Sequence, residues 1–237
     1  MSPRQKRAMR DIVFVIAIAF LLFLIWLVIS HFAGLPDPSG TIKLESALII
    51  EGPGTGVMPK FNRPLAAAWG PDGRIYVSDT GNSRVCVFDT NGRFLSETTG
   101  ASSETTAEAL SQPAGLFVTN EREVFVADIR AGAVFVLDSS GVTTRTLAPG
   151  FAGADSGWHP TDVAMVDGLV YATDVDGVAI FRPDGASLGR LSQAGTPVTL
   201  SRPNGITPGP DGSLVISDTN AQRVASYSVD GDLLWQL

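Results

Sequence analysis

Hydrophobic residues follow two different patterns along the chain. Residues 12–32 form one apolar run of 21 positions without a formally charged side chain. At about 1.5 Å per residue, a helix over this run is about 31 Å long, close to the bilayer's hydrocarbon thickness of about 30 Å. Further along, apolar residues occur in short runs separated by turn residues. The two patterns predict a transmembrane α-helix followed by an all-β domain.

The flanks of the apolar run predict its orientation. Residues 1–11 hold four Lys or Arg and one acidic residue, and the segment after the run opens with Asp37. Because positive flanks stay inside, we expect a single-pass plasma-membrane protein with a cytoplasmic basic tail (1–11) and an extracytoplasmic C-terminal part. The length of the run favours an uncleaved signal-anchor over a signal peptide, whose apolar region is about 7 to 15 residues. Residues 33–40, with Pro36 and Pro38, predict a short stiff linker.

The remaining region, residues 41–237, repeats one pattern four times, over about 63–98, 112–147, 159–191 and 202–237. Each copy starts near a proline that is followed 14 or 15 positions later by an aspartate; the pairs are Pro64 and Asp79, Pro113 and Asp128, Pro160 and Asp174, and Pro203 and Asp218. Turn pairs such as Asp72-Gly73 and Asn91-Gly92 divide a copy into four short apolar runs. In the first copy these runs are Leu65–Trp69, Ile75–Ser78, Val85–Phe88 and Phe94–Thr98. A lone four-stranded meander cannot bury both faces, so the copies are predicted to stack as propeller blades. Helical repeats fit less well, because the runs are short and broken by glycine.

The repeats resemble the NHL repeat family. Ile75–Val85 (IYVSDTGNSRV) and Leu214–Val224 (LVISDTNAQRV) carry its pattern of a strand, Asp, Asn and Arg, whereas the second and third copies depart from the pattern after their Asp. The resemblance implies a β-propeller. It implies no single activity, because the family includes enzymes, receptor sensor domains and interaction platforms.

The number of blades is not settled by the repeats. Residues 41–52 resemble the outer strand of a further, N-terminal blade, whose three other strands have no counterpart in the sequence. NHL propellers usually have six blades and sometimes five. The sequence therefore predicts a C-terminally incomplete six-bladed ring, a ring completed by another chain, or an open arc with an exposed edge, and we favour the first.

Composition removes several functional classes. The chain is 44% hydrophobic, which excludes a disordered protein, and its one cysteine, Cys86, excludes an internal disulfide and a zinc-cysteine site. Residues 12–237 carry 13 basic and 23 acidic side chains. This negative balance repels phosphate backbones, so we expect no nucleic-acid partner.

The four repeat aspartates, Asp79, Asp128, Asp174 and Asp218, are predicted to be structural. Equivalent residues of successive blades lie around a ring, well apart, so they do not converge as metal ligands or general bases. We expect each to accept backbone N–H bonds in the turn after its strand. Asn82, Arg84 and Arg223 belong to the same turns, where the two arginines are expected to pair with an aspartate or to cover neighbouring strands.

Ligand-binding candidates lie beside the repeat prolines, in connections that lead to the innermost strands. They are Arg63, Gln112, His159 and Arg202, just before the prolines, and Asp162 and Asn204, just after them. Loop residues at the mouth of a propeller channel are where such folds bind ligands. Arg63, His159 and Arg202 form a cationic set suited to a carboxylate or an acidic peptide. Solvated loop residues without a binding role are the alternative.

No motif supports catalysis. The amidating lyase related to NHL propellers resembles a zinc enzyme with several histidine ligands, but the chain has only His31 and His159. No catalytic residue, metal ligand or cofactor is therefore predicted. The predicted function is that of a membrane-anchored extracytoplasmic propeller that binds or scaffolds a protein, peptide or envelope ligand. A metal-dependent propeller hydrolase or lactonase, and the sensor domain of a signalling system, are the alternatives.

Overall fold

Each of the four repeats folds into a four-stranded antiparallel sheet in which every strand pairs with its neighbours in sequence. The computed structural model describes residues 48–53, 60–101, 109–150 and 157–237, all within one unit, Leu48–Leu237. The predicted basic tail, transmembrane helix and linker lie outside the described residues. Among the described residues, no helix is long and apolar enough to cross a membrane.

The strands begin and end close to the predicted apolar runs. The first blade contains β1 (Pro64–Trp69), β2 (Ile75–Asp79), β3 (Arg84–Phe88) and β4 (Phe94–Thr98), with a 3-10 turn η1 (Thr80–Asn82) between β2 and β3. The second contains β5 (Pro113–Val118), β6 (Val124–Asp128), β7 (Ala133–Leu137) and β8 (Thr143–Leu147). The third contains β9 (Asp162–Val166), β10 (Leu169–Asp174), β11 (Gly177–Phe181) and β12 (Ser187–Arg190). The fourth contains β15 (Pro203–Pro208), β16 (Leu214–Asp218), β17 (Arg223–Tyr227) and β18 (Leu233–Gln236), after a short hairpin of β13 (Ser192–Gln193) and β14 (Thr196–Pro197).

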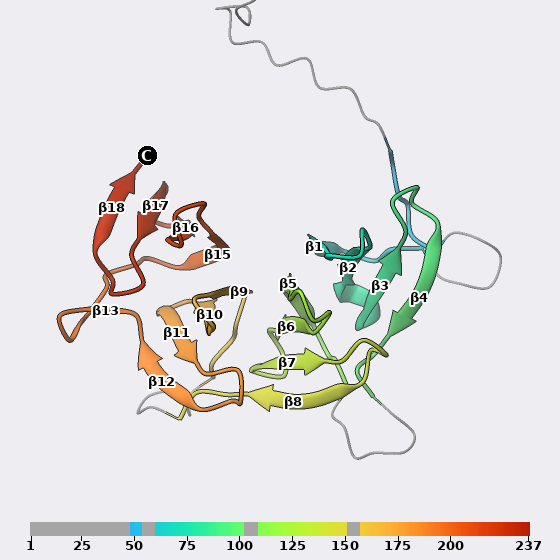
Figure 1. The fold of residues 1–237 in the computed structure, drawn as a ribbon, viewed down its shortest axis with the longest axis horizontal. Coiled ribbons are helices and arrows are strands. Elements are labelled where there is room, and N and C mark those ends of the chain that lie inside the picture. The colour runs from blue at the N-terminus through green and yellow to red at the C-terminus, as the bar shows by residue number, and fades with distance from the viewer. Residues whose placement is uncertain (1–47, 54–59, 102–108, 151–156) are drawn as a thin grey trace, which may run out of the picture. The chain divides into compact units, whose positions relative to one another are not determined.

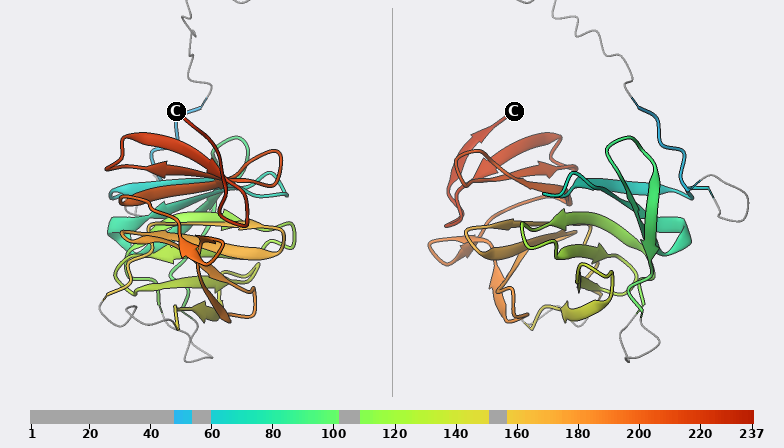
Figure 2. Two further views of the ribbon diagram at one scale, coloured as in Figure 1. Left: turned by 90° about the vertical axis from the view of Figure 1, so that its left-hand side faces the viewer. Right: turned by 45° about the vertical axis from the view of Figure 1, so that its right-hand side comes forward.

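The four sheets are arranged as propeller blades. The first strands of successive blades contact one another in the order β1, β5, β9 and β15, and Figure 1 shows these strands innermost, with β4, β8, β12 and β18 on the perimeter. Figure 2 shows the sheets from two further directions, stacked face to face. The prediction of an all-β propeller with four recognisable blades is confirmed.

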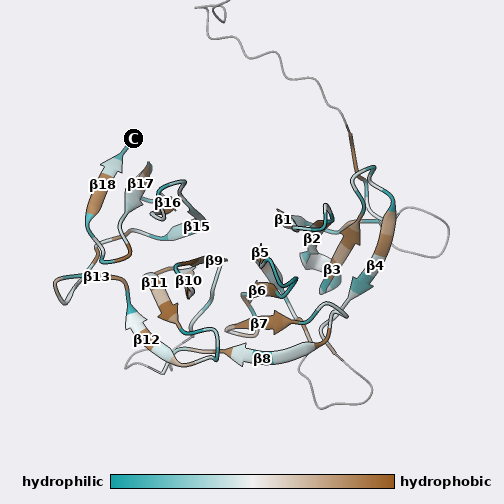
Figure 3. Cartoon of the chain, in the orientation of Figure 1, coloured by the Kyte–Doolittle hydropathy of each residue, from teal (hydrophilic) through white to brown (hydrophobic). Residues whose placement is uncertain are grey.

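The core consists of apolar layers between neighbouring blades. Tyr76 and Val87 of the first blade pack with Phe135 of the second, and alternate residues of the second, including Phe125, pack with Phe181 of the third. A similar layer joins the third and fourth blades. Strands that are covered on both faces are apolar at nearly every position, as β7 is in Figure 3.

A smaller apolar cluster covers the other face of the first blade. There Cys86 and Phe88 are buried beneath Ile50, Phe61 and Phe94, with both Phe61 and Phe94 in edge-to-face contact with the Phe88 ring. Residues 48–50 lie against this blade as one blade's outer strand lies against the next. In both cases the contact is made by the glycine in the turn between the third and fourth strands of a blade. A Cβ on Gly141 would lie 2.8 Å from Thr98, at the end of β4, and a Cβ on Gly92 would lie 3.0 Å from Leu48.

Candidate binding site in the axial cavity

The innermost strands begin around a common cavity. Its lining includes Ile129, the residue that follows each of the four repeat prolines and, in the first three repeats, the next residue as well: Leu65, Ala66, Ala114, Gly115, Thr161, Asp162 and Asn204. The cavity has a volume of about 340 Å³. A second cavity of about 360 Å³ lies along the same strands and is lined mainly by residues three to five positions after the prolines. Ala66 and Asp162 line both, so the two cavities meet at the layer of these residues.

Asp162 is the one charged residue among the described residues that line either cavity. It opens β9, and its carboxylate accepts two backbone hydrogen bonds. The Val163 N–H donates to Oδ1 at 2.9 Å, and the Ile206 N–H, from β15 of the next blade, donates to Oδ2 at 2.9 Å. Burial disfavours the charged form more than these two bonds favour it, and the pKa of Asp162 is raised to about 6. The carboxyl group therefore changes its protonation close to neutral pH.

Small residues at the equivalent positions leave room for this carboxylate. In the other three repeats the residue two after the proline is Ala66, Gly115 or Gly205. A Cβ on Gly115 would lie 2.0 Å from Oδ1 of Asp162, so only glycine fits there. The Gly115 N–H also donates to the Thr161 carbonyl at 3.0 Å, which ties β5 to the start of β9. Sequence differences between the repeats thus create the site.

Two neutral polar side chains complete the cavity. The Thr161 hydroxyl lies 3.0 Å from the Thr173 hydroxyl and 3.4 Å from the Pro203 carbonyl, so it bridges the third and fourth blades. Asn204 is exposed, and no side-chain hydrogen bond joins it to another residue in the described part of the chain. Its amide is available to a ligand as both donor and acceptor.

The other predicted ligand-binding residues lie outside the cavity lining. Arg63 and Arg202 are exposed in left-handed backbone, with φ of 52° and 58°. The His159 ring donates from Nδ1 to the Ile129 carbonyl at 2.8 Å. Gln112 is half-buried, and its backbone N–H donates to Asp128. Of the six candidates, the structure brings Asp162 and Asn204 together in the cavity, and none of the described contacts joins Arg63, His159 and Arg202.

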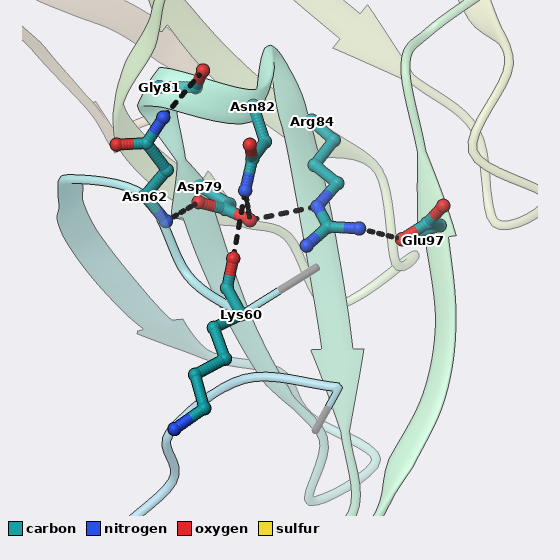
Figure 4. Close-up of polar contacts among 7 residues, drawn as sticks. All are labelled: Lys60, Asn62, Asp79, Gly81, Asn82, Arg84 and Glu97. Atoms are coloured by element: carbon teal, nitrogen blue, oxygen red, sulfur yellow. Dashed lines mark hydrogen bonds and ion pairs between the residues drawn. The ribbon is translucent and has the colours of Figure 1, made fainter. Parts of the chain in front are cut away.

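The repeat aspartates lie away from the cavity and hold the blade connections together. Figure 4 shows Asp79 accepting from the Asn62 N–H at 2.7 Å, from the Asn82 amide at 2.8 Å and from Arg84 Nε at 2.8 Å. Arg84 also donates to Glu97 of β4. The backbone donor to Asp79 comes from the connection before β1, whereas Asp128 accepts both from the connection before β5, at Gln112, and from its own turn, at Ala131.

The match to a known repeat family falls on the first blade and its aspartate turn. Residues 61–88 match the NHL repeat. The NHL match therefore covers the first three strands of the first blade and the whole Asp79 turn, and it leaves most of the axial cavity outside. No curated protein matches the chain by sequence.

Solved structures share the fold at low sequence identity. Virginiamycin B lyase from Staphylococcus aureus is 14% identical with a TM-score of 0.56, over 74% of this chain and 55% of that chain. Hydrazine synthase from Kuenenia stuttgartiensis is 14% identical with a TM-score of 0.57, over 77% and 51%. A putative gluconolactonase is 20% identical with a TM-score of 0.52, over 76% and 63%. The chain thus spans between about half and two thirds of these structures, and the likeness shows the β-propeller fold.

Arg190 is a structural partner of a repeat aspartate that the NHL pattern does not reveal. The third repeat has no arginine after its Asp, yet Asp174 is held by a bidentate contact from Arg190 in β12, with both N–O distances at 3.0 Å. In the fourth repeat Arg223 Nε donates to Asp218 at 2.9 Å, as the NHL pattern of that repeat suggests. Arg190 pairs across from Ala179 just as Glu97 pairs across from Cys86. Aligning the outer strands of the repeats by register would therefore have identified Arg190 as a partner of Asp174.

Within the described ranges, no group of three or more His, Cys, Asp or Glu side chains lies close enough together to hold a metal ion.

Proposed function

We propose that the chain is a binding module that captures a ligand in the axial cavity of an NHL-type propeller. The observation that carries the proposal is the cavity itself: strands from all four repeats line it, and they surround a single half-buried carboxylate, Asp162. Concave sites with apolar walls and a few convergent polar groups are where proteins bind small ligands or chain ends. Even a half-buried carboxylate without a charged partner lowers the stability of the fold, and such groups cluster at functional sites.

The proposal includes a membrane location. The uncharged run of residues 12–32 and the basic residues before it support an anchored propeller on the outer side of a plasma membrane. In that setting the ligand is a peptide, a protein segment or an envelope component. The propeller presents the cavity to this ligand, and the anchor keeps the propeller at the membrane surface.

Ligand capture is tested by closing the cavity. The full chain in detergent micelles is screened by saturation-transfer NMR against small compounds that include amines, acids and neutral molecules. Ala66→Phe fills the layer where the two cavities meet, and Ala131→Phe adds the same side chain at an exposed turn. We expect compounds that bind the wild type and Ala131→Phe but not Ala66→Phe. If no compound distinguishes the two variants, the cavity is not a binding site.

The membrane location is tested by cysteine labelling in intact cells. Ser139 is exposed, and native Cys86 is buried, so Ser139→Cys adds one accessible thiol over a low background. We expect an impermeant maleimide to label Ser139→Cys in intact cells and Ser2→Cys only after permeabilisation. The opposite pattern would place the propeller in the cytoplasm.

A catalytic role is the second candidate, and the carboxyl group of Asp162 favours it. A group with a pKa of about 6 can act as a general acid or base near neutral pH. A propeller hydrolase or lactonase of this kind would turn over a lactone panel, with or without added divalent cations, and would lose that turnover in Asp162→Asn.

A further inference from the structure

The charge of the axial cavity indicates which ligands it accepts. Asp162 contributes the negative charge, and no basic side chain is among the described residues that line either cavity. The carboxylate is bonded by two backbone N–H groups, one on each oxygen. A carboxylate has about four lone-pair sites, so each oxygen keeps the capacity for a further hydrogen bond. A ligand that brings positive charge and N–H donors offsets the cost of burying this group.

The walls set the size and character of the rest of the ligand. Leu65, Ala66, Ala114 and Ile129 supply apolar surface to the cavity, and Asn204 and Thr161 supply neutral polar groups. Leu65 is 54% exposed, so it offers apolar contact area that the protein itself does not cover. The volume of about 340 Å³ suits a small molecule or the end of a chain.

We infer that the axial cavity is a site for a primary ammonium group carried on a compact apolar body, with Asp162 as the anionic acceptor. This inference rests on the proposed function and names the class of ligand that the cavity takes. The ammonium group donates to the Asp162 carboxylate and to the Asn204 amide oxygen, while the apolar body contacts Leu65 and Ile129. An amine or the amino terminus of a peptide has this chemistry.

Other charged ligands fit the lining less well. A carboxylate or phosphate meets the charge of Asp162 with no cation among the described lining residues to receive it. Calcium takes about six to eight oxygen ligands, whereas this lining offers one carboxylate, one amide and one hydroxyl. These alternatives are kept as outcomes of the test.

The test uses three probes of equal length on the full chain in detergent micelles: n-butylammonium, butyrate and n-butanol, at constant ionic strength and pH 7.5. Amide NMR spectra report on the Val163 and Ile206 N–H groups, which donate to Asp162. We expect n-butylammonium to shift both amides saturably, and the other two probes to leave them unchanged. Asp162→Asn is expected to weaken n-butylammonium binding at least tenfold, and Asp230→Asn, which removes the same charge at an exposed turn, to leave it unchanged.

The outcomes separate the ligand class from the function. Shifts of the same amides by butyrate or n-butanol at equal or lower concentration would overturn the ammonium assignment and leave the binding function standing. Tighter binding of Ca²⁺ than of n-butylammonium at these amides would overturn it in favour of a metal site. The binding function would also be contradicted if none of these probes binds and no compound is found whose binding Ala66→Phe abolishes. The wild-type comparison decides the ligand class even if Asp162→Asn does not fold.

Discussion

At the scale of single residues, Asp162 links the binding site to the stability of the fold. Burial raises the pKa of its carboxyl group from 3.8 to about 6, so between these values the folded protein holds a proton that the unfolded chain has lost. The free energy of unfolding therefore falls as pH rises from about 4 to 6. A shift of this size corresponds to roughly 2 to 3 kcal/mol. Denaturant unfolding at a series of pH values measures this loss.

The comparison with Asp162→Asn isolates this titration. The carboxyl groups of half-buried Asp89 and exposed Asp211 have lowered pKa values, chiefly because backbone and side-chain hydrogen bonds favour their charged forms. Protonation of these two groups lowers the free energy of unfolding as pH falls below about 4, which is outside the pH range in which Asp162 titrates. The wild type should lose stability relative to Asp162→Asn between pH 4 and 6.5. Parallel curves across that window would show that the carboxyl group is not perturbed.

Asp79 is predicted to stabilise the first blade through three donors. Asp79→Ala leaves the Asn62 N–H and the buried Arg84 guanidinium without this acceptor. Loss of hydrogen bonds to a charged acceptor costs about 1 to 3 kcal/mol, so we expect a loss of that order in the free energy of unfolding. Asp230→Ala, at an exposed position, serves as the control and should change it little. Equal melting curves for the wild type and Asp79→Ala would contradict the structural role.

At the scale of elements, the approach of β5 to β9 depends on Gly115. A Cβ at this position would lie 2.0 Å from Oδ1 and 2.4 Å from Cα of Asp162, and the backbone contact leaves the strand no simple way to yield. We expect Gly115→Ala to destabilise the protein by about 1 to 3 kcal/mol or to prevent folding. Gly150→Ala, where the nearest atom lies 3.9 Å away, is the matched control. A Gly115→Ala variant as stable as the wild type would mean that the inner strands are more loosely packed than described.

The elements themselves were largely predictable, because strand length and turn chemistry are local properties. The expected run from Phe94 to Thr98 coincides with β4, and Asp-Gly and Asn-Gly pairs lie between the strands. The hairpin of β13 and β14 was not expected, since its strands have two residues each and form no apolar run. Arg190 escaped prediction because its partner lies 16 residues away in another strand and the pairing depends on register.

The site was predictable only in part, for a reason of geometry. Asp162 and Asn204 could be placed near the channel from their spacing after the repeat prolines. Whether Arg63 and Arg202 also reach the cavity depends on backbone conformation, and both adopt a left-handed conformation just before the innermost strand. The pKa of Asp162 depends on how closely β15 and β5 approach β9, which a sequence pattern does not encode.

At the scale of the whole molecule, one architecture tolerates several ways of holding its blade connections. Only residues 61–88 match the NHL repeat, yet all four repeats form the same sheet. The repeat aspartate is satisfied by Arg84 in the first blade, by backbone N–H groups in the second and by Arg190 in the third. The position of the aspartate is kept while its donors change, so the fold persists where the sequence pattern fades.

The segment around Ile50 covers the outward face of the first blade, and Cys86 can report on that contact. The thiol is buried beneath Ile50 and Phe61, and burial raises its pKa to about 12, so it is protonated at neutral pH. Because the thiolate is the reactive form, labelling of the native protein requires this face to open. Ile50→Ala should therefore increase the rate of Cys86 modification by a disulfide reagent about tenfold, since loss of partly buried methyl groups costs on the order of 1 to 2 kcal/mol.

The neighbouring residue provides the control for this measurement. Ile49 is 73% exposed and is absent from the cluster over Cys86, so Ile49→Ala should leave the labelling rate unchanged. A difference between the two variants under native conditions, with equal rates after full unfolding, would show that the segment is held against the blade through Ile50. Equal native rates would mean that Cys86 is reached only by unfolding of the blade itself. In that case residues 48–50 would add nothing to the protection of the first blade.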